Sequence, residues 1–257
     1  MLLSRAPDSA ADRGNKGRDR AETLRLDKKR IGDAALITGA SSGLGRELAI
    51  AFSETGHVII HGRNVEGLEA TRSACKDPKN TTILDGTLNS SAVRVRLASF
   101  ADLYSIKYLI CCAGEYQSGK FESVAADKIR SVLDTNLTDT ISLVRATYPT
   151  LIRTSGTVIA INSVAGRAFN SEESVYVASK FGLTGFMESF RYEARQRNVR
   201  VLDVFAGGIQ TPMSAGHDGY ESLMDAKEVA DVIYKTATTA YQTVAVEQLQ
   251  LGKFRLQ

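Results

Sequence analysis

Cysteine, proline and long apolar runs are all scarce in this chain of 257 residues. Three Cys are too few for a secreted fold held together by disulfides. Four Pro and 21 Gly exclude a collagen-like or low-complexity sequence. No apolar run approaches the roughly 20 residues of a membrane-spanning helix. The composition, with 43% apolar and 24% charged residues, is instead typical of a soluble globular protein with an ample core.

Positive charge is concentrated at the start of the chain. Residues 1–30 hold nine Lys or Arg and five Asp or Glu, whereas residues 31–257 hold 23 and 24. The first segment is polar and almost without apolar periodicity, so we predict a disordered basic extension. A basic arm that touches RNA, a membrane or a protein partner is the alternative. The nearly neutral remainder gives no compositional reason to bind nucleic acid.

The start of the chain also bears on localisation. No apolar stretch of the needed length follows Met1, which argues against a secretory signal. Five acidic residues argue against a mitochondrial transit peptide. We therefore expect a cytoplasmic protein that does not contact a membrane.

From residue 31 onward, short apolar runs alternate with segments of helical spacing, such as Leu44–Thr55, Ser123–Arg153 and Tyr176–Arg197. Runs rich in Val, Ile and Leu without strict alternation are typical of strands covered on both faces. Strands are expected over Ala34–Thr38, His57–Gly62, Thr81–Asp85, Tyr108–Cys112, Thr157–Asn162, Arg200–Phe205 and Thr243–Leu251. The pattern predicts one α/β domain over residues 31–257, a doubly wound parallel sheet of about seven strands with helices on both faces. Such a sheet binds its ligand at the carboxyl ends of the strands.

The first predicted strand runs directly into a glycine-rich turn and then a helix. We expect Gly39 to allow the tight bend, Gly43 to let the backbone approach a pyrophosphate, and Gly45 to let the helix pack closely on the sheet. The N–H groups at the helix start would hold the anion. The turn lacks the Gly-Lys-Ser/Thr ending of a phosphate-transfer loop, so it is typical of a dinucleotide site.

The end of the second predicted strand indicates which dinucleotide binds. NAD sites usually place an Asp or Glu there to bind the ribose 2′-hydroxyl. Here the strand ends in Gly62 and Arg63, and the first carboxylate is Glu66. The Arg63 guanidinium can pair with a 2′-phosphate, which favours NADP(H); a solvated Arg63 is the alternative. Asp85 and Gly86 close the third strand, where Asp85 could accept from the adenine amino group or simply form a turn.

Tyr176 and Lys180 are the centre of the predicted chemistry. They lie four residues apart in a predicted helix, so both project from one face. An ammonium beside a phenol favours the ionised phenol, which can give a proton to a carbonyl oxygen or take one from an alcohol. Ser163 ends the fifth strand region, 13 residues before Tyr176. It could hydrogen-bond the same substrate oxygen.

Together these motifs resemble the short, single-domain branch of the short-chain dehydrogenase/reductase family, over about residues 31–251. The glycine turn is followed by Asn136, Ser163, Tyr176 and Lys180 in the order and spacing of the motifs of this family. The resemblance implies a Rossmann-type domain in which Tyr176 is the general acid/base and Ser163 orients the substrate oxygen. It implies that Lys180 tunes Tyr176 and binds the nicotinamide ribose, and that Asn136 holds a water linking Lys180 to solvent.

The same resemblance implies a set of cofactor contacts. Thr211 would bind the nicotinamide carboxamide, and Ile209 would pack on the ring. The full predicted cofactor set is Gly39, Ser41, Ser42, Gly43, Leu44, Gly45, Arg63, Asp85, Gly86, Cys112, Ala113, Gly114, Tyr176, Lys180, Gly207, Ile209 and Thr211.

Two positions depart from the family pattern. The family usually has Asn-Asn-Ala-Gly after the fourth strand, where this chain has Cys111 and Cys112 before the Ala-Gly pair. The thiols keep the small size but lose amide hydrogen bonds, which weakens local structure more than chemistry. Ala206 replaces a Pro that usually precedes Gly207, which loosens a turn beside the nicotinamide.

No metal site is expected. Cys75, Cys111 and Cys112 lack metal-binding spacing, and the adjacent pair points to opposite faces of a strand. We expect small buried residues, with a redox-sensitive thiol near the cofactor as the alternative. His57 and His61 flank a strand and lack partner ligands.

The substrate pocket is expected between the loops Gly114–Gly119, Val164–Val175 and Pro212–Met224. The second loop has three polar residues that either favour a polar or cationic substrate or are merely solvated: Asn170, Glu172 and Glu173. The following helix carries apolar residues that would partly be exposed on a monomer: Phe181, Phe186, Met187 and Phe190. This predicts a homodimer or homotetramer.

The sequence thus predicts an NADP(H)-dependent oxidoreductase that transfers hydride between nicotinamide and the carbon of a small carbonyl or alcohol substrate. A non-catalytic dinucleotide-binding sensor or scaffold is the alternative, which Cys111, Cys112 and Ala206 mildly favour. The complete polar set around Tyr176 argues against that alternative, because a pure binder needs no proton relay. Nucleic-acid contact through residues 1–30 is a third, weaker hypothesis.

Overall fold

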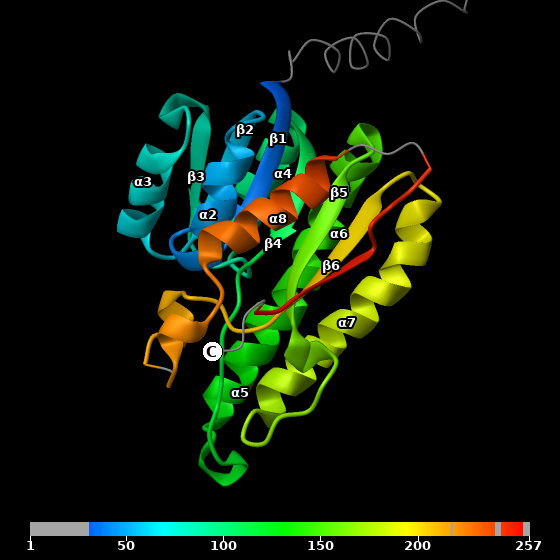
Figure 1. The fold of residues 1–257 in the computed structure, drawn as a ribbon. Coiled ribbons are helices and arrows are strands. Elements are labelled where there is room, and N and C mark those ends of the chain that lie inside the picture. Colours follow the sequence, from blue (N-terminus) through cyan, green and yellow to red (C-terminus); the bar gives the residue numbers. More distant parts are fainter. Residues whose placement is uncertain (1–30, 217, 240–242, 254–257) are drawn as a thin grey trace, which may run out of the picture. The chain divides into compact units, whose positions relative to one another are not determined.

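A computed structural model describes residues 31–216, 218–239 and 243–253 of the chain (Figure 1). The predicted disordered extension over residues 1–30 lies outside the described residues and stays a prediction. Within the described residues no helix is both long and apolar enough to span a bilayer.

Seven parallel strands form one sheet in the described part of the chain, in the order β3-β2-β1-β4-β5-β6-β7. They are β1 (Ile31–Thr38), β2 (His57–Gly62), β3 (Thr81–Asp85), β4 (Tyr104–Cys111), β5 (Thr157–Ser163), β6 (Arg200–Ala206) and β7 (Gln248–Leu251). The predicted fold class is confirmed. Of the last predicted run, only Gln248–Leu251 forms a strand, and β7 pairs with β6 alone at the edge of the sheet.

Helices cover both faces of the sheet because each carries an apolar stripe at helical spacing (Figure 1). On one face lie α2 (Gly43–Phe52), α3 (Val65–Ala74) and α8 (Ala226–Thr238); on the other lie α4 (Ser91–Leu103), α6 (Asp139–Thr154) and α7 (Ser174–Arg195). In α2 the stripe is Leu44, Leu48 and Phe52, all buried. The core therefore consists of two apolar layers, one on each side of the strands.

The segment Ser123–Arg153, which the sequence predicts as helical, is helical from Ala126 to Thr154, but it is not a regular α-helix throughout. The structure divides this segment into α5 (Ala126–Leu133), a π-helical turn (Asp134–Thr138) and α6. Apolar periodicity is too coarse to detect the π-turn, because the turn only widens a continuous helical path locally. The turn contains Asn136, which is buried.

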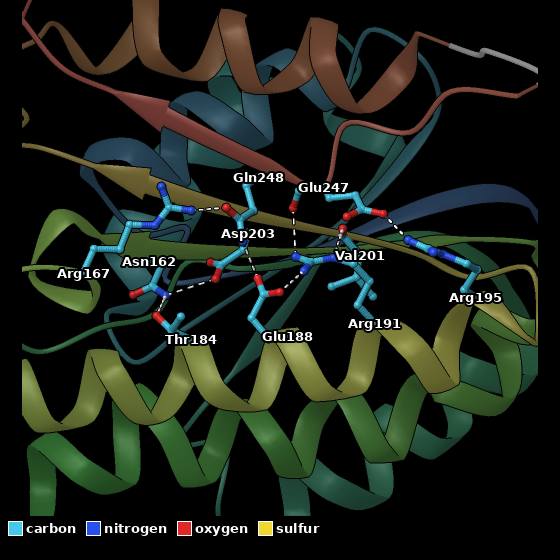
Figure 2. Close-up of polar contacts among 10 residues, drawn as sticks. All are labelled: Asn162, Arg167, Thr184, Glu188, Arg191, Arg195, Val201, Asp203, Glu247 and Gln248. Atoms are coloured by element: carbon cyan, nitrogen blue, oxygen red, sulfur yellow. Dashed lines mark hydrogen bonds and ion pairs between the residues drawn. The ribbon is translucent and has the colours of Figure 1, made fainter.

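Polar contacts connect the edge strand β7 to helix α7 (Figure 2). The buried Arg191 of α7 pairs with Glu188 at 2.6 Å and donates to the backbone oxygen of Glu247 at 3.0 Å. The side chains of Glu188 and Gln248 are also hydrogen-bonded, at 2.5 Å. At the other end of β7, the Gly207 N–H donates to the Leu251 oxygen at 2.9 Å. The edge strand thereby holds the loop that follows β6.

Gly45→Ala is expected to destabilise the fold by about 1–3 kcal/mol, the typical effect of overpacking. A Cβ at Gly45 would overlap the backbone oxygen of Gly39, so the turn would have to open. Gly185→Ala on α7 is the control, since a Cβ there meets nothing within 4 Å. That change should be neutral or stabilising by up to about 1 kcal/mol. Urea denaturation measures both, and equal effects of the two changes would contradict the close packing at Gly45.

Candidate active site

A cleft of about 1120 Å³ lies at the carboxyl ends of the strands. It exceeds the roughly 300–1,000 Å³ of a typical small-molecule pocket. It has room for a ligand larger than one small substrate. The predicted site residues that line it are Gly39, Ser41, Ser42, Gly43, Leu44, Gly45, Arg63, Gly86, Cys112, Ala113, Gly114, Ser163, Tyr176, Lys180, Gly207, Ile209 and Thr211.

The glycine turn forms one wall of the cleft and brings β1 close to the end of β4. Gly39 has a φ of +69°, and a Cβ there would lie 2.8 Å from the Cα of Ala113. This position therefore requires glycine for both its conformation and its close approach. Helix α2 begins at Gly43, so its free N–H groups face the cleft at the point expected for an anion.

The end of β4 is held by Thr38, which the sequence did not single out. Its Oγ1 accepts from the N–H groups of Cys112 and Ala113, at 3.1 Å each. Two of the backbone hydrogen bonds at this end therefore do not depend on the side chains that replace the family's asparagines.

The adjacent thiols lie on opposite faces of the sheet. Cys111 packs in the layer with α6 and α7, whereas Cys112 packs against the layer with α2 and α8. Burial raises the pKa of each thiol to about 12. Both thiols are therefore protonated at neutral pH. Among the described residues, no group of His, Cys, Asp or Glu could hold a metal ion.

Tyr176, Lys180 and Ser163 converge on the cleft from α7 and β5. The Lys180 ammonium is buried, donates to the Ile161 backbone oxygen at 3.0 Å and lies 5.7 Å from the centre of the Tyr176 ring. Ser163 ends β5, and its Oγ accepts from the Ala165 N–H at 3.1 Å. That bond uses an acceptor site, so the Ser163 hydroxyl proton stays available for a ligand.

Asn136 lies behind this group rather than in the cleft wall. Its Oδ1 accepts from the Glu115 N–H at 2.7 Å, and its Nδ2 donates to the Glu115 oxygen and to Ser179 Oγ at 2.9 Å each. Ser179 Oγ in turn donates to the backbone oxygen of Tyr176 at 2.7 Å. The side chain thus connects the segment after β4 to the helix that carries Tyr176 and Lys180.

At the opposite end of the cleft, one of the two predicted charged cofactor residues lines the wall and the other does not. Arg63 is exposed and lines the cleft. Asp85 does not line it, because its carboxylate pairs with Arg96 at 2.8 Å. His61 lines it unexpectedly: Nε2 lies 3.0 Å from the Gly86 oxygen, while Nδ1 is buried without a partner. Burial lowers the His61 pKa to about 4, so the ring is neutral at physiological pH.

Tyr116 is a cleft residue that sequence reasoning missed. Its ring meets the Tyr176 ring edge-on, with centroids 5.0 Å apart and an interplanar angle of 77°. Its hydroxyl donates to Glu173 Oε1 at 2.6 Å. The only signal for Tyr116 was its position in the predicted pocket loop Gly114–Gly119.

Comparison with known proteins decides the family. A sequence model described as short chain dehydrogenase matches residues 33–219. The chain belongs to the short-chain dehydrogenase/reductase family. An uncharacterized oxidoreductase of Staphylococcus epidermidis is 28% identical over 207 residues, covering 79% of this chain and 90% of that protein. Nodulation protein G of Rhizobium sp. (strain N33) is 32% identical over 185 residues, covering 71% and 76%.

The fold of this short-chain dehydrogenase/reductase is also found among solved structures. An alcohol dehydrogenase from the archaeon Thermococcus sibiricus, solved with 5-hydroxy-NADP, superimposes with a TM-score of 0.78 at 18% identity. The match covers 88% of this chain and 98% of that one. At this identity the likeness shows the fold alone.

A buried carboxyl group of this short-chain dehydrogenase/reductase is hydrogen-bonded to Asn162, the residue before Ser163 (Figure 2). Asp203 of β6 is fully buried; its Oδ2 accepts from Asn162 Nδ2 at 3.3 Å, and its Oδ1 has no partner. Asn162 Oδ1 accepts from the Ser163 N–H at 2.9 Å. Burial raises the pKa of Asp203 to about 6, although the Asn162 hydrogen bond and the charges of Arg191 and Lys180 oppose the rise. The nearby Glu188 adds to it.

Asp203→Asn is expected to stabilise the protein at pH 8 by up to about 3 kcal/mol, the equivalent of about two pKa units. The folded-state pKa of Asp203 lies above the ordinary value of 3.8. The wild type therefore loses stability relative to the variant as the pH rises from about 4 to about 6. Urea denaturation of both proteins between pH 4 and pH 8 measures the difference in stability between them. A difference that does not change with pH would contradict a titrating buried carboxyl group.

Proposed function

We propose that this short-chain dehydrogenase/reductase is an NADP(H)-dependent oxidoreductase acting on carbonyl or alcohol substrates. The main support for this proposal is that Tyr176, Lys180 and Ser163 line the same cleft as the glycine turn. A bound nicotinamide would supply or accept the hydride, and the protein would move the proton. The predicted cytoplasmic location belongs to this proposal as well.

Tyr176 is the proposed general acid/base. The Lys180 ammonium, 5.7 Å from the ring centre, favours negative charge on the phenol oxygen during proton transfer. The Ile161 carbonyl holds this ammonium in place, and burial limits its screening by solvent. Lys180 would also bind the nicotinamide ribose.

Ser163 is proposed to orient the substrate oxygen. Its Oγ accepts one backbone hydrogen bond, which fixes the hydroxyl while leaving its proton free to donate. A substrate oxygen held by Ser163 and protonated by Tyr176 would keep its carbon at one place in the cleft. Fixed geometry of this kind is a large part of enzymatic rate enhancement.

Asn136 is proposed to act mainly by positioning. Both hydrogens of its amide and one acceptor site are used by Glu115 and Ser179. A relay water toward Lys180 would have to use the remaining acceptor site of the side chain or the main chain of the π-helical turn. The turn itself supports such a role, because π-turns within helices are frequent at functional sites.

The cofactor end of the cleft fits a dinucleotide on three grounds. Gly39 and Gly45 make a close turn that a Cβ would fill, and α2 begins beside it. His61 Nδ1 is a buried, unpartnered atom on the cleft wall, which a hydroxyl group of a ligand could satisfy. Gly62 supplies no carboxylate where NAD sites usually have one, whereas Arg63 supplies a cation, which supports NADP(H).

The nicotinamide end involves the segment after β6. Ile209 and Thr211 line the cleft, and Met224 pairs with Ile209 in a parallel bridge. The main-chain bond from Gly207 to Leu251 supports this loop although Ala206 replaces the usual proline. Asp85, which pairs with Arg96, is the predicted cofactor residue that the geometry supports least.

A homodimer or homotetramer is proposed as the assembly. Of the four predicted interface residues, Met187 and Phe190 are buried in the core, so they do not supply the surface. Phe181 instead stacks on Phe169, with centroids 5.2 Å apart, and Phe169 is 82% exposed. The exposed Phe169, which stacks on a partly buried residue of α7, supports an interface beside this helix.

Tyr176→Phe is expected to lower turnover by about 100- to 10,000-fold, the usual contribution of general acid–base catalysis. The affinity for NADPH should be unchanged, because only a hydroxyl is lost. Steady-state NADPH oxidation and calorimetric titration check the two parts. Tyr192→Phe is the control, a tyrosine on the same helix that is 69% exposed. Full activity of the Tyr176 variant would refute the mechanism, and the absence of NADPH oxidation by the wild type with any carbonyl would favour a sensor or scaffold.

Arg63→Met is expected to weaken NADPH binding by roughly 10- to 100-fold, the scale of hydrogen bonds to a charged group. NADH binding should not change, since NADH lacks the 2′-phosphate. Thermal-shift titrations with each cofactor measure this, because a ligand that binds only the folded state raises the melting temperature. Arg72→Met on α3, whose guanidinium pairs with Glu69, is the matched control. Equal losses for both cofactors would contradict the role of Arg63 as a phosphate ligand.

A further inference from the structure

The substrate end of the cleft contains a carboxylate that the proposed mechanism does not use. Glu173 directly precedes α7 and lies three residues before Tyr176. Its Oε1 accepts from the Tyr116 hydroxyl at 2.6 Å, and its Oε2 accepts from Asn170 Nδ2 at 3.0 Å. The residues that line the cleft include Glu173, its two partners Tyr116 and Asn170, and Tyr176. The carboxylate is therefore held in one orientation by two bonds.

Both partners of Glu173 are uncharged, so they position its negative charge without cancelling it. In the described part of the chain, no Lys or Arg forms an ion pair with this carboxylate. Burial and the bond to Glu173 raise the pKa of Tyr116 to about 12, so its hydroxyl remains the proton donor. Glu173 also makes no side-chain hydrogen bond to the start of α7.

Glu115, another carboxylate in the same cleft, differs from Glu173 because it forms an ion pair. Its carboxylate pairs with Lys128 at 2.5 Å and accepts from Ser131 at 2.5 Å. That charge is neutralised within the protein, whereas the charge of Glu173 is not. A partly enclosed carboxylate with remaining acceptor sites attracts a cation.

Tyr116 connects this charge to the reacting group. Its ring contacts the Tyr176 ring edge-on, and its hydroxyl donates to Glu173, so the Tyr116 side chain bridges the carboxylate and the Tyr176 ring. Aromatic faces beside a carboxylate are also favourable surroundings for an ammonium group.

We propose that Glu173, positioned by Tyr116 and Asn170, selects carbonyl or alcohol substrates that carry an ammonium group a few bonds from the reacting carbon. The proposal rests on the proposed oxidoreductase function and names the substrate class of the same site. Glu173 is a specificity-determining residue here: its charge acts on substrate binding and leaves proton transfer by Tyr176 unchanged.

The test uses carbonyl pairs that differ only in charge. Betaine aldehyde has a trimethylammonium group where tert-butylacetaldehyde has a tert-butyl group of nearly the same shape. Para-acetyl-N,N,N-trimethylanilinium and para-tert-butylacetophenone form a second, aromatic pair. We measure kcat and KM for NADPH oxidation with each compound, and thermal shifts of the NADP⁺-loaded protein with the same compounds.

The wild type is expected to favour the cationic member of at least one pair by about tenfold or more in kcat/KM, the scale of an interaction with a charged group. Glu173→Gln keeps the acceptor for Tyr116 and removes the charge. It should abolish the preference by raising the KM of the cationic member to that of the neutral member. Glu172→Gln removes the same charge one residue away, from a side chain that is exposed and outside the cleft wall, and should keep the preference.

Two results would overturn the proposal. One is an equal response of the wild type to the cationic and neutral members of both pairs, including no response to either. The other is a preference that survives in Glu173→Gln. A wild type that reduces neutral ketones without preferring cations would sink this inference alone, whereas failure to oxidise NADPH with any carbonyl would sink the proposed function.

Discussion

The buried ammonium of Lys180 is the interaction on which the geometry of the site depends. A charge removed from water must have a partner, and here one hydrogen-bond partner is the Ile161 carbonyl of β5. That bond fixes α7 against the strand that ends at Ser163. Tyr176, one turn before Lys180, lines the same cleft as Ser163. The arrangement requires a backbone carbonyl that can accept a hydrogen bond from outside the sheet. Such carbonyls are found where a parallel strand approaches its carboxyl end.

A second set of bonds holds the same helix from the other side. Asn136 bonds to both backbone groups of Glu115 and to Ser179, so hydrogen bonds join the segment after β4 to α7. Asn136 lies in the π-helical turn, where it is buried. A π-turn widens the helix locally and so changes the direction of the side chains it carries.

The sheet and its order of elements could be predicted because each strand and helix has its own local apolar pattern. Tyr176, Lys180 and Ser163 were likewise predictable, since short spacings bring them together. The break at Asn136 was not predictable, because one extra residue in a turn hardly changes the periodicity. The bond between Tyr116 and Glu173 joins residues 57 positions apart, and Thr38 reaches Cys112 over 74. Such contacts depend on how segments that are far apart in the sequence pack against each other, which no local pattern encodes.

The two adjacent thiols have a chemical consequence. Burial raises the pKa of each thiol to about 12, so the thiolates, which are the species that oxidants and alkylating reagents attack, are scarce at neutral pH. A folded molecule is therefore protected kinetically even though Cys112 borders an open cleft. Modification of Cys111, which is buried within β4, would then follow transient separation of β4 from its neighbours, so its rate would report how often the middle of the sheet opens.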